Sequence, residues 1–161
     1  DLRGVIRLNS GPFANGKTAN EGSALSSLGR KYPNEVTGIS IDSKAEKIHF
    51  LMGSTFSTNM EKGATAATFR IKYDDGKTLD FPIIAKKDIF DWWTPYRSPG
   101  LMEKELQPEN IGWIGFNYKG EGRGLVKPIW VNPHPDKTIA TIDFISGLIR
   151  CAPFVVGITL E

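Results

Sequence analysis

Short apolar runs separated by glycine and proline make up most of the chain. Its 161 residues include 17 Gly and 10 Pro, and no long stretch repeats apolar residues at the 3.6-residue spacing of a helix. Apolar and polar positions alternate instead, as in strands whose successive side chains point to opposite faces. The pattern predicts nine strands, at residues 4–9, 35–41, 47–53, 67–73, 78–85, 112–117, 125–131, 139–146 and 154–160.

These strands predict an all-β fold, a two-sheet antiparallel β-sandwich of jelly-roll type formed as a single domain over residues 1–161. A parallel sheet is disfavoured because the chain offers no helices for the crossover connections. We expect the two chain ends to lie on neighbouring strands. The last strand alternates cleanly, which predicts one face made of Phe154, Val156, Ile158 and Leu160.

Two glycine-rich segments are predicted to be loops. Residues 14–30 are rich in Gly, Ala, Ser and Asn, which favours a long loop with a helical turn near residues 24–28. The stretch "GEGRG", residues 120–124, has the glycines of a phosphate-binding loop but joins two strands rather than opening a helix. We therefore expect a hairpin loop there.

One hairpin can be predicted to the register. In "FRIKYDDGKTLDF", residues 69–81, a two-residue turn would mix apolar and polar side chains on each face. A three-residue loop instead pairs Ile71 with Leu79 and Phe69 with Phe81, and it places Gly76 at the left-handed position of a type I turn followed by a G1 bulge. Since the hydrophobic pattern fixes register, we predict the three-residue loop.

Composition narrows the classes of function. The chain is 40% hydrophobic and 24% charged, as is ordinary for a globular protein, and its net charge is only +2. That balance argues against nucleic-acid binding, which needs a concentrated basic face. No apolar run approaches the roughly 20 residues of a membrane span. The opening "DLRGVIRL" is patterned like a strand rather than a signal peptide, so we expect a mature or excised domain.

Metal and nucleophilic chemistry find little support. His49 and His134 are far apart and belong to no HxH or HExxH motif, and Cys151 has no partner for a disulfide or a zinc site. We expect Cys151 to be buried in the core and no cofactor or catalytic metal to be present. A structural calcium ion remains open, because loop oxygens can bind it without a compact motif. No GxSxG elbow is present, so we expect a protein that is not an enzyme.

Aromatic residues near strand ends are the strongest candidates for a binding site. An indole or phenol face can cover the C–H patch of a sugar, while Asp, Asn, Arg and His side chains hydrogen-bond its hydroxyls. Trp113, within "NIGWIGF", alternates like a strand residue and is predicted to be core, whereas Trp130 could be core or ligand-binding. The candidate ligand-binding residues are Trp92, Trp93, Tyr96, Arg97, Asp91, Trp130, Asn132, His134 and His49.

The adjacent tryptophans in "DIFDWWTPYRSPG", residues 88–100, are predicted to have different roles. Neighbouring side chains of an extended chain point to opposite faces, so one ring should turn inward and anchor the segment. We expect Trp92 to be that anchor. Trp93 is then expected to be partly exposed as a platform for ligand, beside Tyr96 and Arg97.

Several segments together resemble a bacterial β-sandwich module of the galactose-binding-like (discoidin-type) or carbohydrate-binding kind. They are "DLRGVIRL", "KAEKIHFLMGS", "FRIKYDDGKTLDFPI", "DIFDWW", "IGWIGF", "IWVNPHPDKTIATIDF" and "APFVVGITLE". The resemblance implies a jelly roll appended to secreted glycan-degrading or cell-surface proteins, and an extracytoplasmic location. The chain departs from that pattern at Met52, where relatives often have a second histidine.

The leading hypothesis is a non-catalytic carbohydrate-binding module that tethers a larger secreted protein to a polysaccharide. A second hypothesis is a structural or protein-interaction sandwich that packs against a neighbouring catalytic domain, since interfaces are also enriched in Trp, Tyr and Arg. A glycoside hydrolase or lyase is the third, because 18 acidic residues leave a catalytic carboxylate pair open. The expected partner is a polysaccharide or oligosaccharide, with no nucleic acid and no membrane.

Overall fold

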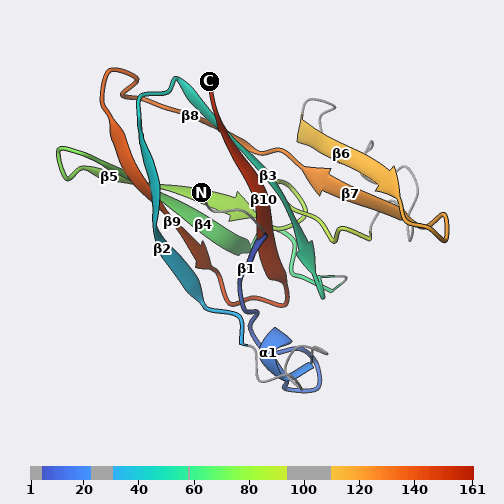
Figure 1. Ribbon diagram of the computed structural model, residues 1–161. Helices are drawn as coiled ribbons and strands as arrows, with labels where there is room; N and C mark the ends of the chain where they lie inside the picture. The colour runs from blue at the N-terminus through green and yellow to red at the C-terminus, as the bar shows by residue number, and fades with distance from the viewer. Residues whose placement is uncertain (1–4, 23–30, 58, 94–109) are drawn as a thin grey trace.

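The computed structural model describes residues 5–22, 31–57, 59–93 and 110–161, which form two antiparallel sheets packed face to face (Figure 1). In the first sheet the order is β1-β10-β3-β7-β6, and β8 also pairs with β3. The second has the order β2-β9-β4-β5. The elements are β1 Ile6–Arg7, α1 Ala19–Gly22, β2 Glu35–Ser43, β3 Lys47–Thr55, β4 Thr65–Tyr73, β5 Thr78–Ile84, β6 Ile111–Phe116, β7 Gly122–Val126, β8 Ile129–Val131, β9 Ile139–Ser146 and β10 Ala152–Leu160.

This topology confirms the predicted all-β jelly roll. The chain passes repeatedly from one sheet to the other, so that β3 lies beside β10 and β4 lies beside β9. The first and last strands, β1 and β10, are neighbours, as expected, with Ile6 opposite Val155 and Arg7 opposite Phe154. The β6–β7 hairpin extends to one side of the sandwich (Figure 1).

A stack of phenylalanine rings joins the two sheets. Phe50 of β3 lies face to face with Phe69 of β4 at a centroid distance of 3.8 Å, and Phe69 stacks on Phe144 of β9 at 4.6 Å. All three side chains are fully buried. Burial of each ring contributes about 1.5–3 kcal/mol, so this stack is a major part of the core that fixes the spacing of the sheets.

The β4–β5 hairpin has the predicted register. Ile71 lies opposite Leu79 and Phe69 opposite Phe81, and Gly76 has a φ of 84°. The three-residue loop is therefore confirmed. The hydrophobic pattern was sufficient here because one face of β4 is buried and the other is partly exposed, so a slip of one residue would exchange the two faces.

One predicted strand and one predicted loop differ from the structure. The single strand expected at 125–131 is two strands, β7 and β8, and both pair with β3. Pro128 separates them because it has no N–H for a ladder, although its carbonyl accepts a hydrogen bond from Phe50 N. Residues 122–124 of the expected glycine loop are buried strand, and the turn lies before them, with Gly120 at a φ of 75°.

The clean alternation predicted for residues 154–160 is interrupted by a β-bulge. The register shifts between Val155 and Gly157, which leaves Val156 as an extra residue that is 41% exposed. Phe154 therefore shares a face with Gly157 rather than with Val156. The helical turn expected near residues 24–28 lies outside the described residues.

We expect Gly76→Val to lower the free energy of unfolding by about 1 kcal/mol or more, because a β-branched residue is strained at positive φ. Urea unfolding measures this change. Gly76→Asn is the matched control, since Asn tolerates the left-handed region. Equal stability of the Val and Asn variants would contradict the role assigned to this turn.

Cys151 is fully buried just before β10, as predicted. Its burial and, to a smaller extent, the negative charge of Asp91 raise the pKa of its thiol to about 12. At neutral pH the native thiol is therefore protonated and inaccessible. A chromogenic disulfide reagent should react with native protein at a small fraction of the rate seen in urea. Rapid, stoichiometric reaction of the native protein at pH 7 would contradict the burial of Cys151.

Candidate functional site

The segment that carries the tryptophan pair is inserted into the first sheet. β3 and β7 pair directly only where Met52 faces Val126, and residues 90–92 fill the space beyond that point. On one side Ser54 N–H donates to Phe90 O and Trp92 N–H donates to Ser54 O, and on the other Gly124 N–H donates to Trp92 O. This short stretch, parallel to β3, therefore acts as an extra strand that fixes Asp91 and Trp92 in the sheet.

Asp91 connects this inserted segment to the turn after β3. Its Oδ2 accepts from Ser57 N at 3.2 Å and from Ser57 Oγ at 3.1 Å, while its Oδ1 accepts from Trp93 N at 3.0 Å. Ser57 Oγ also accepts from Ser54 Oγ at 2.7 Å. Asp91 is only 8% exposed, so its carboxylate holds two chain segments together inside the protein.

The outer face of the first sheet carries the tryptophans. Arg7, Phe154 and Gly53 are register neighbours across β1, β10 and β3, and they share a face because opposed residues point the same way. Since Met52, next to Gly53, is fully buried, that face is the outer one. A side chain at Gly53 would come within 3.0 Å of the Phe154 ring, so glycine there leaves room for the aromatic layer.

Trp92 and Trp93 both lie in this outer layer. Trp92 packs edge-on against Phe154 with ring centroids 6.0 Å apart, and the Arg123 guanidinium lies 3.1 Å from the centroid of the Trp93 ring. Both tryptophans are half-buried and neither belongs to the core. The prediction that Trp92 turns inward is therefore wrong, because the inward position of this segment is taken by Asp91, the bridge partner of the fully buried Ser54.

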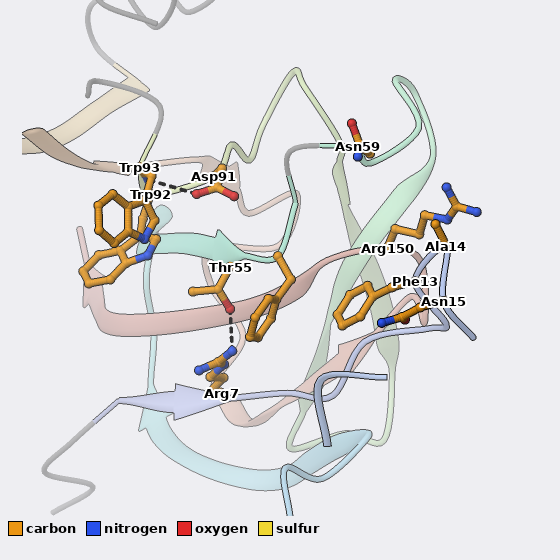
Figure 2. Close-up of a pocket in the computed structure, with 11 residues that line it drawn as sticks. Arg7, Phe13, Ala14, Asn15, Thr55, Asn59, Asp91, Trp92, Trp93 and Arg150 are labelled. Carbon is orange, nitrogen blue, oxygen red and sulfur yellow. Dashed lines mark hydrogen bonds between the residues drawn. The ribbon is translucent and has the colours of Figure 1, made fainter. Parts of the chain in front are cut away.

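A cavity of about 630 Å³ opens beside the tryptophans (Figure 2). In that view Trp92 and Trp93 stand on one side, Phe13, Asn15 and Arg150 on the other, and Arg7 with Thr55 between them. Its size is within the range of ligand sites in proteins. The lining residues are Arg7, Phe13, Ala14, Asn15, Thr55, Phe56, Asn59, Asp91, Trp92, Trp93 and Arg150.

Phe56 is displayed at this cavity by an unusual backbone conformation. Its φ is 58°, a left-handed value that is uncommon for a bulky residue and costs on the order of 1–3 kcal/mol. The ring is 43% exposed and lies 5.3 Å from the ring of Phe13. The next residue, Ser57, is the one that Asp91 binds, so the buried carboxylate helps to hold this strained turn.

Arg7 is held rigidly beside Phe56. Its Nη2 donates to Thr55 Oγ1 at 2.5 Å and its Nη1 to Tyr32 Oη at 3.1 Å. The guanidinium carbon lies 4.4 Å from the centroid of the Tyr32 ring and 5.2 Å from that of Phe56. Partial burial lowers the pKa of Arg7 from its ordinary value, but a guanidinium remains protonated at every physiological pH.

The opposite side of the cavity is formed where the N-terminal loop meets the β9–β10 connection. Gly11 N–H donates to Ile149 O at 2.8 Å. A side chain at Gly11 would lie 1.7 Å from Leu148 O, so only glycine permits this contact. The contact brings the turn that starts at Phe13 to Arg150, although these residues are far apart in the sequence.

Three predicted site residues lie away from the cavity, at the other end of β3. Trp130 is 8% exposed and is part of the core. Asn132 is also buried, and it accepts from Tyr73 Oη and from His134 N while donating to Ala45 O. His134 contacts the edge of the Tyr73 ring. These contacts organise the loop after β8, and none of the three lines the cavity.

His49 does not line the cavity either. It lies on β3, and its Nε2 is 2.8 Å from Glu161 Oε2. Hydrogen bonds from Lys47 and, to a smaller extent, from His49 lower the pKa of the Glu161 carboxyl, so His49 belongs to a hydrogen-bonded group at the end of β10. Tyr96 and Arg97 fall outside the described residues.

Trp113 corrects another prediction, because it is 46% exposed rather than buried. β6 is an edge strand of the first sheet, and the Trp113 ring lies over Gly115, where a side chain would come within 2.1 Å of it. Alternation alone could not reveal this, since it shows that two faces differ but not which face is covered.

No group of three or more His, Cys, Asp or Glu side chains able to hold a metal ion occurs among the residues that the structure describes. Within the same residues no helix is long and apolar enough to cross a membrane. Comparisons with protein families, with curated proteins and with solved structures find no match.

We expect Asp91→Ala to destabilise the protein by at least about 2 kcal/mol, because it leaves buried donors of Ser57 and Trp93 without their acceptor. Asp91→Asn keeps one oxygen and should cost less. Urea unfolding measures both, with exposed Asp136→Ala as a control that should stay within about 0.5 kcal/mol of wild type. Wild-type stability of Asp91→Ala would contradict the connecting role of this carboxylate.

Proposed function

We propose that this protein is a non-catalytic carbohydrate-binding domain whose ligand occupies the cavity beside Phe56 and Trp92. The observation that carries the proposal is the exposed Phe56 ring, held in a strained backbone conformation at the wall of a cavity lined by aromatic and polar side chains. Strain of this kind persists only where the surroundings impose it, and it is concentrated at functional sites.

The composition of the cavity supports a sugar as ligand. Aromatic rings provide flat apolar surface for the C–H face of a pyranose, and the arginine and asparagine side chains provide hydrogen bonds for its hydroxyls. Phe56 takes the platform role that the sequence suggested for Trp93, since a guanidinium already covers one face of the Trp93 ring. Trp92 contributes the edge of the cavity nearest β10.

The proposed role is attachment of a larger secreted protein to a polysaccharide. A repeated ligand and a linked catalytic or surface domain supply avidity, so a dissociation constant on the order of micromolar to millimolar is sufficient. The jelly-roll frame supports the role only by positioning the loops, because a fold of this class hosts many unrelated functions.

Phe56→Ala should weaken binding to the best ligand of a polysaccharide panel by about tenfold or more, a loss of roughly 1.4 kcal/mol, measured by calorimetric titration. The melting temperature should change little, because the ring is 43% exposed. Tyr118→Ala is the matched control, since Tyr118 is an aromatic residue 92% exposed and outside the cavity. A wild-type domain that binds no glycan in the panel would refute the proposal.

The β6–β7 hairpin favours a second candidate, contact with a neighbouring catalytic domain. Phe116 is 74% exposed and Tyr118 is 92% exposed, and Trp113 and Ile114 of the same hairpin are also exposed. Several exposed large side chains in one element are typical of an interaction surface. In that case Phe116→Ala together with Tyr118→Ala would weaken association with the adjoining domain of the full-length protein and leave glycan binding intact. The two candidates therefore depend on different residues and can be separated.

A further inference from the structure

Three donor groups at the cavity have no acceptor among the residues that the structure describes. Arg7 Nε and Trp92 Nε1 are buried and lack a hydrogen-bond partner within the described part of the chain. The Arg150 side chain lies across the cavity from Trp92 (Figure 2), and the described residues provide it with no hydrogen bond or ion pair. A ligand that satisfies these groups must supply acceptors rather than donors.

The charge of the cavity also favours a ligand that supplies hydrogen-bond acceptors. Four arginines lie among the described residues, and the two outside the cavity are paired with carboxylates, Arg70 with Asp80 at 2.8 Å and Arg123 with Glu121 at 2.9 Å. The other two, Arg7 and Arg150, both line the cavity, and neither has a carboxylate partner in this part of the chain.

Asp91 does not compensate these two charges. Among the described residues it is the only acidic one in the lining, and its two oxygens accept hydrogen bonds from Ser57 and Trp93. Two guanidinium groups against one carboxylate give the described lining an excess of positive charge. Arg7 is also partly buried, and a buried cation is unfavourable unless it is paired.

We propose that the ligand of this cavity is an acidic glycan, in which carboxylate or sulfate groups on the sugars bind the guanidinium groups of Arg7 and Arg150. The inference rests on the proposed glycan-binding function and specifies its ligand class. A guanidinium matches an oxyanion with parallel N–H donors, and such charge-assisted hydrogen bonds are stronger than neutral ones. The sugar ring then covers Phe56 while its acidic group supplies the missing acceptors.

The test titrates the domain with polygalacturonate, its carboxyl-reduced neutral counterpart, dextran sulfate and neutral dextran at two salt concentrations. An acidic polymer should bind at least about tenfold more tightly than its neutral counterpart, and added salt should weaken that binding. Preference for polygalacturonate identifies a carboxylate as the acidic group, and preference for dextran sulfate identifies a sulfate.

Variants locate the binding. Arg150→Gln should lower affinity for the acidic polymer about tenfold without loss of stability, because this side chain is exposed. Arg7→Lys keeps the charge but loses the fork of donors, and it should also weaken binding. Arg70→Gln removes an equal charge outside the cavity and should have little effect. An equal loss with Arg70→Gln would show diffuse attraction and overturn the inference.

The remaining outcomes separate this inference from the proposed function. Equal binding of a polymer and its neutral counterpart, lost in Phe56→Ala, would overturn the acidic ligand while the glycan-binding function stands. Absence of binding to every polymer in this set and in a broad glycan panel would overturn both.

Discussion

The carboxylate of Asp91 joins the two chain segments from which the cavity is built. One segment is the inserted strand that carries Trp92, and the other is the turn after β3 that carries Phe56. Each would be poorly fixed alone, since the first pairs with its neighbours over only a few residues and the second is strained. Because the carboxylate is buried, its hydrogen bonds are protected from competition with water.

The sandwich determines where this carboxylate can act. The phenylalanine stack fixes the spacing of the sheets, while β3 and β7 pair at a single position before the inserted segment separates them. The aromatic side chains then lie on the outer face of the first sheet, and the core remains closed behind them. The cavity is thus an addition to the jelly roll that can vary without disturbing its interior.

The sequence predicted the parts of this protein that depend on local pattern. The β4–β5 register followed from alternating side chains and one glycine, and the burial of Cys151 followed from its place at the start of an apolar strand. Asp91, Trp92 and Trp93 were predicted to bind ligand, and the structure places all three in the lining of one cavity. Local composition was sufficient there because these residues are neighbours in the chain.

The other side of the cavity was missed because it is assembled by long-range contacts. Arg7, Phe56 and Arg150 come from three distant segments, and nothing near each of them in the sequence indicates the others. Arg7 does interrupt an apolar strand, a signal that a polar partner or ligand lies on that face. The prediction that Trp92 turns inward was wrong for a related reason. Which residue of this segment points into the protein depends on its pairing with Ser54 of β3, and the local sequence does not reveal that pairing.

The most direct test of this account is a ¹H–¹⁵N correlation spectrum of the domain titrated with a short oligosaccharide of whichever acidic polymer, polygalacturonate or dextran sulfate, it binds more tightly. The account predicts that shift changes concentrate at the Trp92 indole N–H and at the backbone amides of Arg7, Thr55 and Phe56, with the indole signal moving as its donor gains an acceptor. Changes confined to the β6–β7 hairpin or to the loop after β8, with the Trp92 indole signal unmoved, would contradict it.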